Sequence, residues 1–265
     1  MKENDDDERN DMLQQDSVAV ITGGGAGIGA AIASRLVTEG TRSVIVSYIG
    51  SPEDANNTVR KLEDRGAQAE AVQADVRDDE QVRELAARCE ERFGRCDVLI
   101  NSAGTTSWIP FTDLEAVTDE VWNNVLGVNL LGAFRCARAF APMLRASGGA
   151  IVNIASISAY RGIGSSIPYG VSKAALVQLT RSLAVTLGPE VRVNSVSPGT
   201  VATSWQINRH GEEGFAEMTA RERAVAPLAR TLGPEDVADT VIGLLGAKGV
   251  TGVDVIVDAG KHLMY

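Results

Sequence analysis

Basic side chains and cysteines are scarce in this chain. Of its 265 residues, 25 are Lys or Arg against 35 Asp or Glu, which gives a formal net charge of −10. Nucleic-acid binders need a basic face that displaces phosphate counterions, so this balance excludes that class. The three cysteines, Cys89, Cys96 and Cys136, are an odd number without Cys-x-x-Cys spacing. Neither a disulfide framework nor a zinc knuckle is therefore expected.

Histidine is rarer still, and long apolar runs are lacking. His210 and His262 are the two histidines, and neither has a second ligand at metal-binding spacing, so no metal is expected. No apolar run approaches the about 18 residues of a membrane span, and residues 1–16 contain no apolar signal segment. The sequence therefore predicts a cytoplasmic protein that does not bind membranes.

Apolar residues are plentiful: they make up 44% of the chain, enough for a hydrophobic core. Residues 1–16 differ, because they hold seven acids against two bases and few apolar side chains. We expect a disordered acidic tail there, which carries half of the net charge. Residues 17–265 are expected to form one folded domain, since no linker or repeat divides them.

Short apolar runs alternate with helical stretches along this domain. Helices are expected over stretches such as 28–39, 79–93, 119–141 and 172–187. The seven strand-like runs are 17–22, 43–47, 69–74, 97–101, 150–155, 191–196 and 253–257. Strands that alternate with helices predict an α/β fold with a doubly wound parallel sheet, covered by helices on both faces.

A glycine-rich turn joins the first apolar run to the first helix, as a dinucleotide-binding site requires. Glycines let the backbone approach a pyrophosphate, and the helix N-terminus supplies free N–H groups. The candidate contacts in this turn are Thr22, Gly23, Gly25, Gly27, Ile28 and Gly29. An ordinary strand-to-helix turn explains the same pattern, so the motif needs support from elsewhere in the chain.

Support comes from a tyrosine and a lysine four residues apart. Tyr169 and Lys173 would lie one turn apart on the same face of a helix. An ammonium beside a phenol stabilises the phenolate and lowers its pKa from about 10, which suits proton transfer near neutral pH. Ser156 follows the apolar run 150–155 and would stand at the carboxyl end of the sheet, where α/β enzymes bind ligands.

Taken in order, these motifs resemble the short-chain dehydrogenase/reductase family. The matching pattern is Thr22-Gly23-x-x-x-Gly27-x-Gly29, Asp75-Val76, Asn101-x-Ala103-Gly104, Asn129, Ser156, Tyr169-x-x-x-Lys173 and Pro198-Gly199. The resemblance extends from Ser17 to about Leu263 and is strongest to 3-oxoacyl-acyl-carrier-protein reductases and their relatives. It implies a Rossmann-type fold and an NAD(P)-dependent enzyme that transfers hydride between nicotinamide and a ketone or secondary alcohol.

The resemblance also implies four catalytic residues. Tyr169 would be the general acid that protonates the carbonyl oxygen, and Ser156 would donate a hydrogen bond to that oxygen. Lys173 would bind the nicotinamide ribose and lower the pKa of Tyr169. Asn129 lies within the expected helix 119–141, where asparagine is a poor helix former. In the family, a local break at this position holds a water that leads to the lysine.

Further cofactor contacts are implied at the ends of later strands. Asp75 and Val76 would contact the adenine ring, and the turn with Asn101, Ala103 and Gly104 would lie beside the adenosine ribose. The nicotinamide and its carboxamide would contact Pro198, Gly199, Val201 and Thr203. Ser102 and Ala259 stand where the family usually has asparagine and glycine, and both departures are small.

The choice between NAD and NADP depends on the end of the second strand. NAD specificity normally needs an acid there to accept bonds from the ribose 2′-hydroxyl. This chain instead has Ser47 and Tyr48, followed by Ser51, which are possible donors to a 2′-phosphate. Many NADP-using relatives carry a basic residue in the glycine loop, where this chain has Ala26. NADP(H) is favoured, and NAD(H) remains possible.

The substrate is expected to be a free small molecule. Carrier-protein reductases tend to place basic residues beside the catalytic strand and helix, but Ser147 and Glu190 hold those places here, with Arg145 nearby. Charge repulsion therefore disfavours an acidic carrier protein, although 3-oxoacyl-acyl-carrier-protein reductase remains the alternative. Six apolar residues fit a substrate pocket, a lid or a subunit interface equally well: Trp108, Ile109, Trp205, Ile207, Phe215 and Met218.

Two expectations concern the protein as a whole. A catalytically idle NAD(P)-binding sensor or scaffold is the alternative of another class, but it would need only the cofactor contacts and not the four catalytic residues. Similarity to the family predicts a homotetramer or homodimer built on the helices that contain Asn129 and Lys173.

Overall fold

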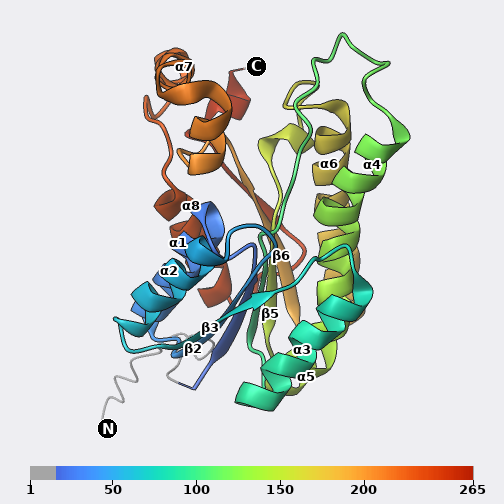
Figure 1. Cartoon of the computed structure of the whole chain (residues 1–265), viewed down its shortest axis with the longest axis vertical. Helices are drawn as coiled ribbons and strands as arrows, with labels where there is room; N and C mark the ends of the chain where they lie inside the picture. Colours follow the sequence, from blue (N-terminus) through green and yellow to red (C-terminus); the bar gives the residue numbers. More distant parts are fainter. Residues whose placement is uncertain (1–15, 265) are drawn as a thin grey trace, which may run out of the picture.

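Seven parallel strands form one sheet through the centre of the molecule, in the order β3-β2-β1-β4-β5-β6-β7 (Figure 1). The computed structural model describes residues 16–264, so residues 1–15 of the expected tail lie outside the described part. The strands are β1 (Val18–Thr22), β2 (Ser43–Tyr48), β3 (Gln68–Gln73), β4 (Val98–Asn101), β5 (Ala150–Ile154), β6 (Arg192–Pro198) and β7 (Asp254–Val257). The expected doubly wound α/β fold is confirmed.

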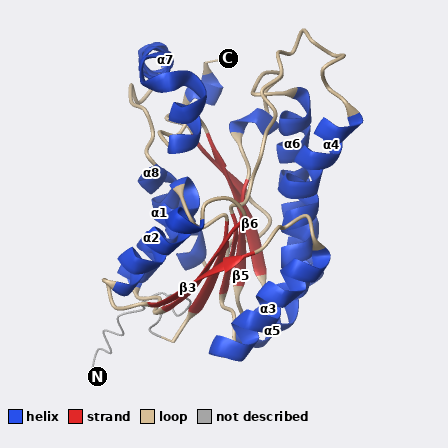
Figure 2. Ribbon diagram, in the orientation of Figure 1, coloured by secondary structure: helices blue, strands red, loops and turns tan. Residues whose placement is uncertain are grey.

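Helices cover both faces of this sheet (Figure 2). On one face lie α1 (Gly27–Glu39), α2 (Pro52–Glu63) and α8 (Pro234–Gly246), and α1 packs closely on α8. The other face carries α3 (Asp79–Phe93), α4 (Asp119–Leu126), α5 (Ala133–Ser147) and α6 (Ile167–Leu187). Because both faces are covered, the central strands are buried throughout, as in β1 and β5, where every residue is buried.

One helix lies apart from these two layers. Helix α7 (Ser204–Val225) stands beyond the carboxyl ends of the strands (Figure 1). Gly211 has φ 70° and ψ 166°, so it divides α7 into two helical segments that run in different directions. The left-handed φ at this point favours glycine because a side chain would be strained there.

Two expected helices differ from those observed. The stretch expected as one helix over 119–141 is α4, then a π-helix over Gly127–Gly132, then α5, which continues to Ser147. The helix expected from Ser172 begins five residues earlier, at Ile167. Ser166 caps it by accepting a hydrogen bond from the backbone N–H of Tyr169, and Pro168 stands in its first turn, where no N–H is needed.

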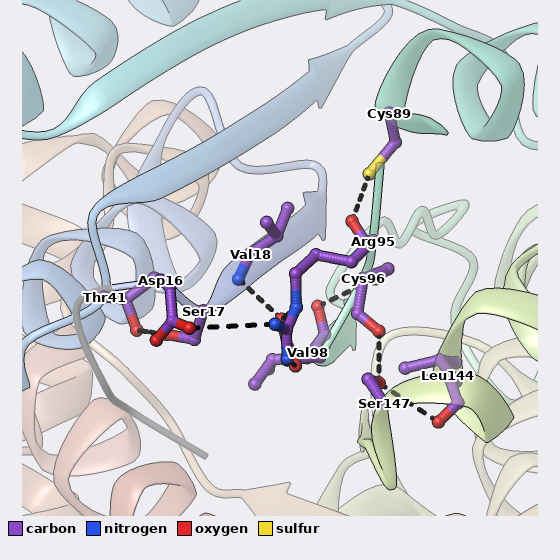
Figure 3. A network of polar contacts seen from close by, with 11 residues as sticks. Asp16, Ser17, Val18, Thr41, Cys89, Arg95, Cys96, Val98, Leu144 and Ser147 are labelled. Carbon is purple, nitrogen blue, oxygen red and sulfur yellow. Dashed lines mark hydrogen bonds and ion pairs between the residues drawn. The ribbon is translucent and has the colours of Figure 1, made fainter. Parts of the chain in front are cut away.

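A polar network joins the amino ends of β1 and β4 (Figure 3). The carboxylate of Asp97 accepts the backbone N–H of Val18 at 2.8 Å and pairs with Arg95 at 2.6 Å. Arg95 also reaches Asp16 at 3.8 Å, the last residue of the expected tail. Nearby, the Ser147 hydroxyl donates to the carbonyl of Cys96 at 2.7 Å. Structural contacts therefore occupy the amino end of the sheet, which leaves the carboxyl end for a ligand.

The strand order identifies where a ligand binds. The chain runs outward from β1 to β3 and then returns to β4 on the other side of β1. Ligands of such sheets bind outside the carboxyl ends of the strands at this reversal. Within residues 16–264, none of the helices combines the length and apolar character needed to cross a bilayer.

Candidate active site

A cavity of about 730 Å³ opens at the carboxyl ends of β1, β4, β5 and β6. Many residues singled out from the sequence line it: Gly23, Gly27, Ile28, Gly29, Gly104, Ser156, Tyr169, Lys173, Pro198, Gly199, Val201 and Thr203. The structure thus brings the glycine-rich turn and the Tyr-Lys pair into one site, although 146 residues separate Gly23 from Tyr169.

The glycine-rich turn is shaped by close backbone contacts. Gly23 has φ 64°, and a Cβ there would lie 2.9 Å from the Cα of Ala103. A Cβ on Gly29 would collide with the carbonyl oxygen of Gly23. Side chains are therefore excluded at both positions, and the start of α1 packs closely against the end of β1.

The N-terminus of α1 suits an anion. Its N-cap residue, Ala26, has no side chain to satisfy the free N–H groups, and the first turn contains no acid. The cavity is lined here by Gly27, Ile28 and Gly29, so these N–H groups and the positive end of the helix dipole border it. The residues present therefore fit the pyrophosphate of a dinucleotide.

Thr22 and Asn101 do not line the cavity, but their hydrogen bonds hold the backbone beside it. The Thr22 hydroxyl accepts the backbone N–H groups of Ser102 and Ala103, both at 3.2 Å. The buried Asn101 amide donates to the side-chain oxygen of Asn153 at 2.8 Å. These bonds fix the turn after β4 against the end of β1.

Ser156, Tyr169 and Lys173 meet in the cavity from two elements. Ser156 follows β5 and caps a short 3₁₀ helix (Ile157–Ala159) by accepting the N–H of Ser158 at 3.2 Å. Tyr169 and Lys173 lie one turn apart on α6, as their spacing predicts, and the Lys173 ammonium is 5.7 Å from the centre of the Tyr169 ring. Two hydroxyls and an ammonium therefore border one space.

Burial controls the proton affinity of these groups. Burial lowers the pKa of Lys173 to about 8, because the ammonium is removed from water. The ammonium donates a hydrogen bond to the carbonyl of Ile154 at 2.8 Å. Burial also raises the pKa of Tyr169, and a hydrogen bond with Ser156 opposes this shift. The expectation that Lys173 lowers the pKa of Tyr169 is not met, since the loss of solvation dominates.

Asn129 lies in the π-helix and joins two walls of the site. Its oxygen accepts the N–H of Thr105 at 2.8 Å, and its amide donates to the Thr105 carbonyl and the Ser172 hydroxyl, both at 2.9 Å. Ser172 in turn donates to the carbonyl of Tyr169 at 2.7 Å. The wide π-turn at this asparagine agrees with the expected break in the helix, and it connects the loop after β4 to α6.

The remaining cofactor candidates lie outside the cavity lining. Ser47 is buried, and Ser51 caps α2 by accepting the N–H of Asp54 at 3.1 Å. Asp75 binds Arg77 through three contacts of 2.6–3.0 Å, which lowers the pKa of Asp75. The other candidates outside the lining are Thr22, Gly25, Tyr48, Val76, Asn101, Ala103 and Asn129.

Three of the six apolar candidates line the cavity. They are Trp108, Trp205 and Met218, whereas Ile109, Ile207 and Phe215 are absent from its lining. The sequence left open whether this group lines a pocket, packs a lid or forms a subunit interface, and the structure assigns three of its members to the cavity lining.

A buried charged cluster in the cavity wall was missed from the sequence. Lys261 is 5% exposed, and its ammonium contacts the carboxylate of Glu222 at 2.6 Å and the hydroxyl of Thr200 at 3.2 Å. Thr200 also donates to Glu222 at 2.8 Å. The cluster fastens α7 to the segment after β7. No sequence spacing relates these three residues, so no local signal indicates them.

We expect Glu222→Gln to lower the free energy of unfolding by about 2 kcal/mol. Removing one partner of a fully buried ion pair costs about 3–5 kcal/mol, and the partial exposure of Glu222 reduces this. Urea unfolding measures the change. The double variant Glu222→Gln/Lys261→Met, which removes both charges, should recover part of the loss. Equal stability of wild type and Glu222→Gln would show that the pair does not hold α7.

Comparison with known proteins identifies the family. A family model described as "Enoyl-(Acyl carrier protein) reductase" matches residues 23–262. A relative from Streptomyces violaceoruber, "Granaticin polyketide synthase putative ketoacyl reductase 2", is 44% identical over 248 residues, which cover 93% of this chain and 96% of that protein. The chain belongs to the short-chain dehydrogenase/reductase family.

Other members agree with this assignment. The L-rhamnose 1-dehydrogenase (NAD(P)(+)) of Azotobacter vinelandii is 36% identical over 259 residues, which cover 94% of this chain and 98% of that protein. The crystal structure of levodione reductase superposes with a TM-score of 0.87 at 30% identity, covering 95% of this chain and all of that chain. As a member of this family, the protein is an NAD(P)-dependent oxidoreductase of alcohols or ketones.

Within residues 16–264, no group of three or more His, Cys, Asp or Glu side chains is arranged to hold a metal ion.

Proposed function

We propose that this protein is a ketoreductase that interconverts a free ketone and a secondary alcohol. The observation that carries the proposal is the convergence of Ser156, Tyr169 and Lys173 on the cavity that the glycine-rich turn also lines. A proton donor and an anion-binding turn thus share one cavity, which is the arrangement that nicotinamide-dependent carbonyl reduction requires.

The bound nicotinamide cofactor supplies the hydride to the carbonyl carbon. The Tyr169 phenol, whose pKa is raised, is protonated at neutral pH and gives its proton to the carbonyl oxygen, so the product is the alcohol. Ser156 donates a hydrogen bond to the same oxygen and stabilises its developing negative charge. Lys173 binds the ribose hydroxyls, and Asn129 positions α6 through Ser172.

Residues at the strand ends would hold the cofactor. The α1 N-terminus would bind the pyrophosphate, and the nicotinamide would contact Pro198, Gly199, Val201 and Thr203, which line the cavity. Asp75 and Val76 would contact the adenine ring, and the turn with Asn101, Ala103 and Gly104 would lie beside the adenosine ribose. These assignments follow the family pattern, and the position of each group at the carboxyl edge of the sheet supports them.

NADPH should be preferred over NADH. β2 ends at Tyr48 without an acid, and Tyr48 and Ser51 offer hydroxyls where NAD-specific folds place a carboxylate, whereas Ser47 is buried. Initial rates with each cofactor should therefore give a higher kcat/KM for NADPH. A higher value for NADH would contradict the assignment, and Ser51→Asp, which adds an acid here, should shift the ratio towards NADH.

The proposed function is tested by NADPH oxidation with a panel of free ketones and with a 3-oxoacyl thioester on a carrier protein. At least one free ketone should be reduced, and Tyr169→Phe serves as the control that lacks the proton donor. Faster reduction of the carrier-bound thioester would favour the alternative, 3-oxoacyl-acyl-carrier-protein reductase. Cofactor binding without reduction of any substrate would instead favour an idle sensor or scaffold.

We further propose a homodimer or homotetramer that buries one face of α5 and α6. Large apolar side chains are exposed on the π-helix, α5 and α6: Leu131, Phe134, Val171 and Val185. Exposed apolar side chains on neighbouring helices are typical of a subunit interface. Sedimentation at micromolar concentration should give a multiple of the 28.0 kDa chain mass. The mass of a single chain would contradict this proposal.

A further inference from the structure

Aromatic rings from two distant segments meet in the cavity wall. Trp108 lies in the loop after β4, and Trp205 and His210 lie in the first segment of α7. The Trp108 ring centre is 6.2 Å from that of Trp205 and 5.5 Å from that of His210, which meets it edge-on at 82°. All three side chains line the cavity that contains Tyr169. We refer to these three residues as the aromatic cluster.

The aromatic cluster is held in a fixed relation to the proton donor. The Ile109 N–H donates to the Ser165 carbonyl at 3.0 Å, and the Thr106 and Ser165 hydroxyls are 2.6 Å apart. These bonds tie the Trp108 loop to the residues just before α6. Ser166, the next residue, caps the helix at Tyr169. A substrate ring on the aromatic cluster would therefore be oriented relative to the Tyr169 hydroxyl.

The rings are more exposed than simple packing of a lid requires. Trp205 is 45% exposed, whereas the core aromatic Phe140 is fully buried. The Arg209 guanidinium lies 5.3 Å from the centre of the Trp108 ring, and Arg209 is not among the cavity-lining residues. It therefore supports Trp108 from outside the cavity. The cluster thus presents aromatic surface to the substrate space.

We propose that the aromatic cluster selects ketones in which a planar aromatic ring is joined to the carbonyl carbon or fused beside it. Aromatic rings bind one another in offset or edge-to-face arrangements, as Trp108 and His210 already do, and a saturated ring of equal size gains no such contact. This inference rests on the proposed ketone reduction and defines its substrate class.

The test compares two bicyclic ketones with the same ten-carbon skeleton: 1-tetralone, which contains a planar aromatic ring, and trans-1-decalone, which is saturated. Steady-state kinetics would be measured for wild type, Trp108→Leu and Trp108→Phe. The variant-to-wild-type ratio for each ketone cancels its intrinsic reactivity. We expect Trp108→Leu to raise KM for 1-tetralone about tenfold and KM for trans-1-decalone much less. Trp108→Phe, which keeps an aromatic ring, should retain most of the preference.

Two further variants guard against loss of folding and against unspecific effects. Trp205→Leu changes a more exposed ring of the aromatic cluster and should show the same selectivity if Trp108→Leu does not fold. Trp122 in α4 is absent from the cavity lining, so Trp122→Leu should leave the ratio of the two KM values unchanged. Equal rises of KM for both ketones, or no rise for either, would overturn the inference.

Calorimetric titration of each ketone into the protein saturated with NADP⁺ or NAD⁺ separates this inference from the proposed function. Tighter binding of 1-tetralone that Trp108→Leu abolishes, without turnover of any ketone, would keep the aromatic assignment and overturn the ketoreductase. Turnover of both ketones, with equal affinities that Trp108→Leu does not change, would keep the ketoreductase and overturn the aromatic assignment.

Discussion

The Tyr169→Phe variant is expected to reduce ketones about 10²- to 10⁴-fold more slowly than the wild type at neutral pH. The substitution removes one hydroxyl and keeps the ring, so the cavity retains its shape. Since the pKa of Tyr169 is raised by burial, the wild-type phenol holds its proton throughout the neutral range and is ready to donate it. The variant has no other group at this position to protonate the carbonyl oxygen. Single-turnover rates measure the loss in the chemical step directly.

Cofactor binding provides the control for this experiment. The dissociation constant of NADPH, measured by its fluorescence, should change by no more than about fivefold, the effect of one lost hydrogen bond. Turnover equal to the wild type, with cofactor still bound, would show that Tyr169 is not the proton donor. Loss of cofactor binding would instead point to a structural defect, which far-UV circular dichroism would reveal.

The Lys173→Met variant is expected to be more stable than the wild type at pH 7 in the absence of cofactor, although it should lose activity. Lys173 is 4% exposed, and its pKa falls from 10.5 to about 8 on folding. That difference corresponds to about 3 kcal/mol, of which the lost hydrogen bond to Ile154 offsets about 1 kcal/mol. The expected gain in unfolding free energy is thus about 2 kcal/mol.

The sign of the pH dependence distinguishes this explanation from better packing of methionine. Between pH 8 and 10.5, Lys173 is protonated in the unfolded chain but has released its proton in the folded protein. Because the unfolded state binds more protons in this range, Lys173 makes the wild type more stable as the pH rises. The advantage of Lys173→Met should therefore be full below pH 8 and largely lost by pH 10.5. Urea unfolding at both ends of this range measures it. A constant advantage, or none, would contradict the prediction.

A matched control is available on α2. Lys61 is exposed, so Lys61→Met changes the same charge without releasing a buried ammonium. Its unfolding free energy should differ little from that of the wild type at either pH. The expected opposition between stability and activity at Lys173 is typical of functional sites, where a buried charge is kept for its role in binding.

Local sequence signals predicted the elements on which the site is built. The alternation of apolar runs and helical stretches depends on neighbouring residues, and all seven strands were placed within a few residues of their observed positions. The four-residue spacing of Tyr169 and Lys173 put both on one helical face. The start of α6 was placed five residues late because the Ser166 cap was not recognised as its beginning. The break in the helix at Asn129 was expected only through resemblance to the family, and its form, a π-helix, was not predicted.

The pKa of Tyr169 could not be predicted from spacing. A lysine four residues away suggested a lowered value, but the sign depends on how much water the fold removes from the phenol. Burial of Tyr169 in the folded protein makes the loss of solvation the larger effect, and Lys173 directs a hydrogen bond to the Ile154 carbonyl. Both facts come from β5 and α6 packing together, which no local pattern describes.

The sequence by itself determined the doubly wound fold and the ordered motifs of the short-chain dehydrogenase/reductase family, because turns, caps and helical spacing are properties of adjacent residues. Only the tertiary structure brought Trp108 against Trp205, and Lys261 against Glu222. Those contacts join segments 97 and 39 residues apart in the chain. These pairs form because α7 packs over the carboxyl ends of the strands, so these walls of the cavity could be identified only in the folded molecule.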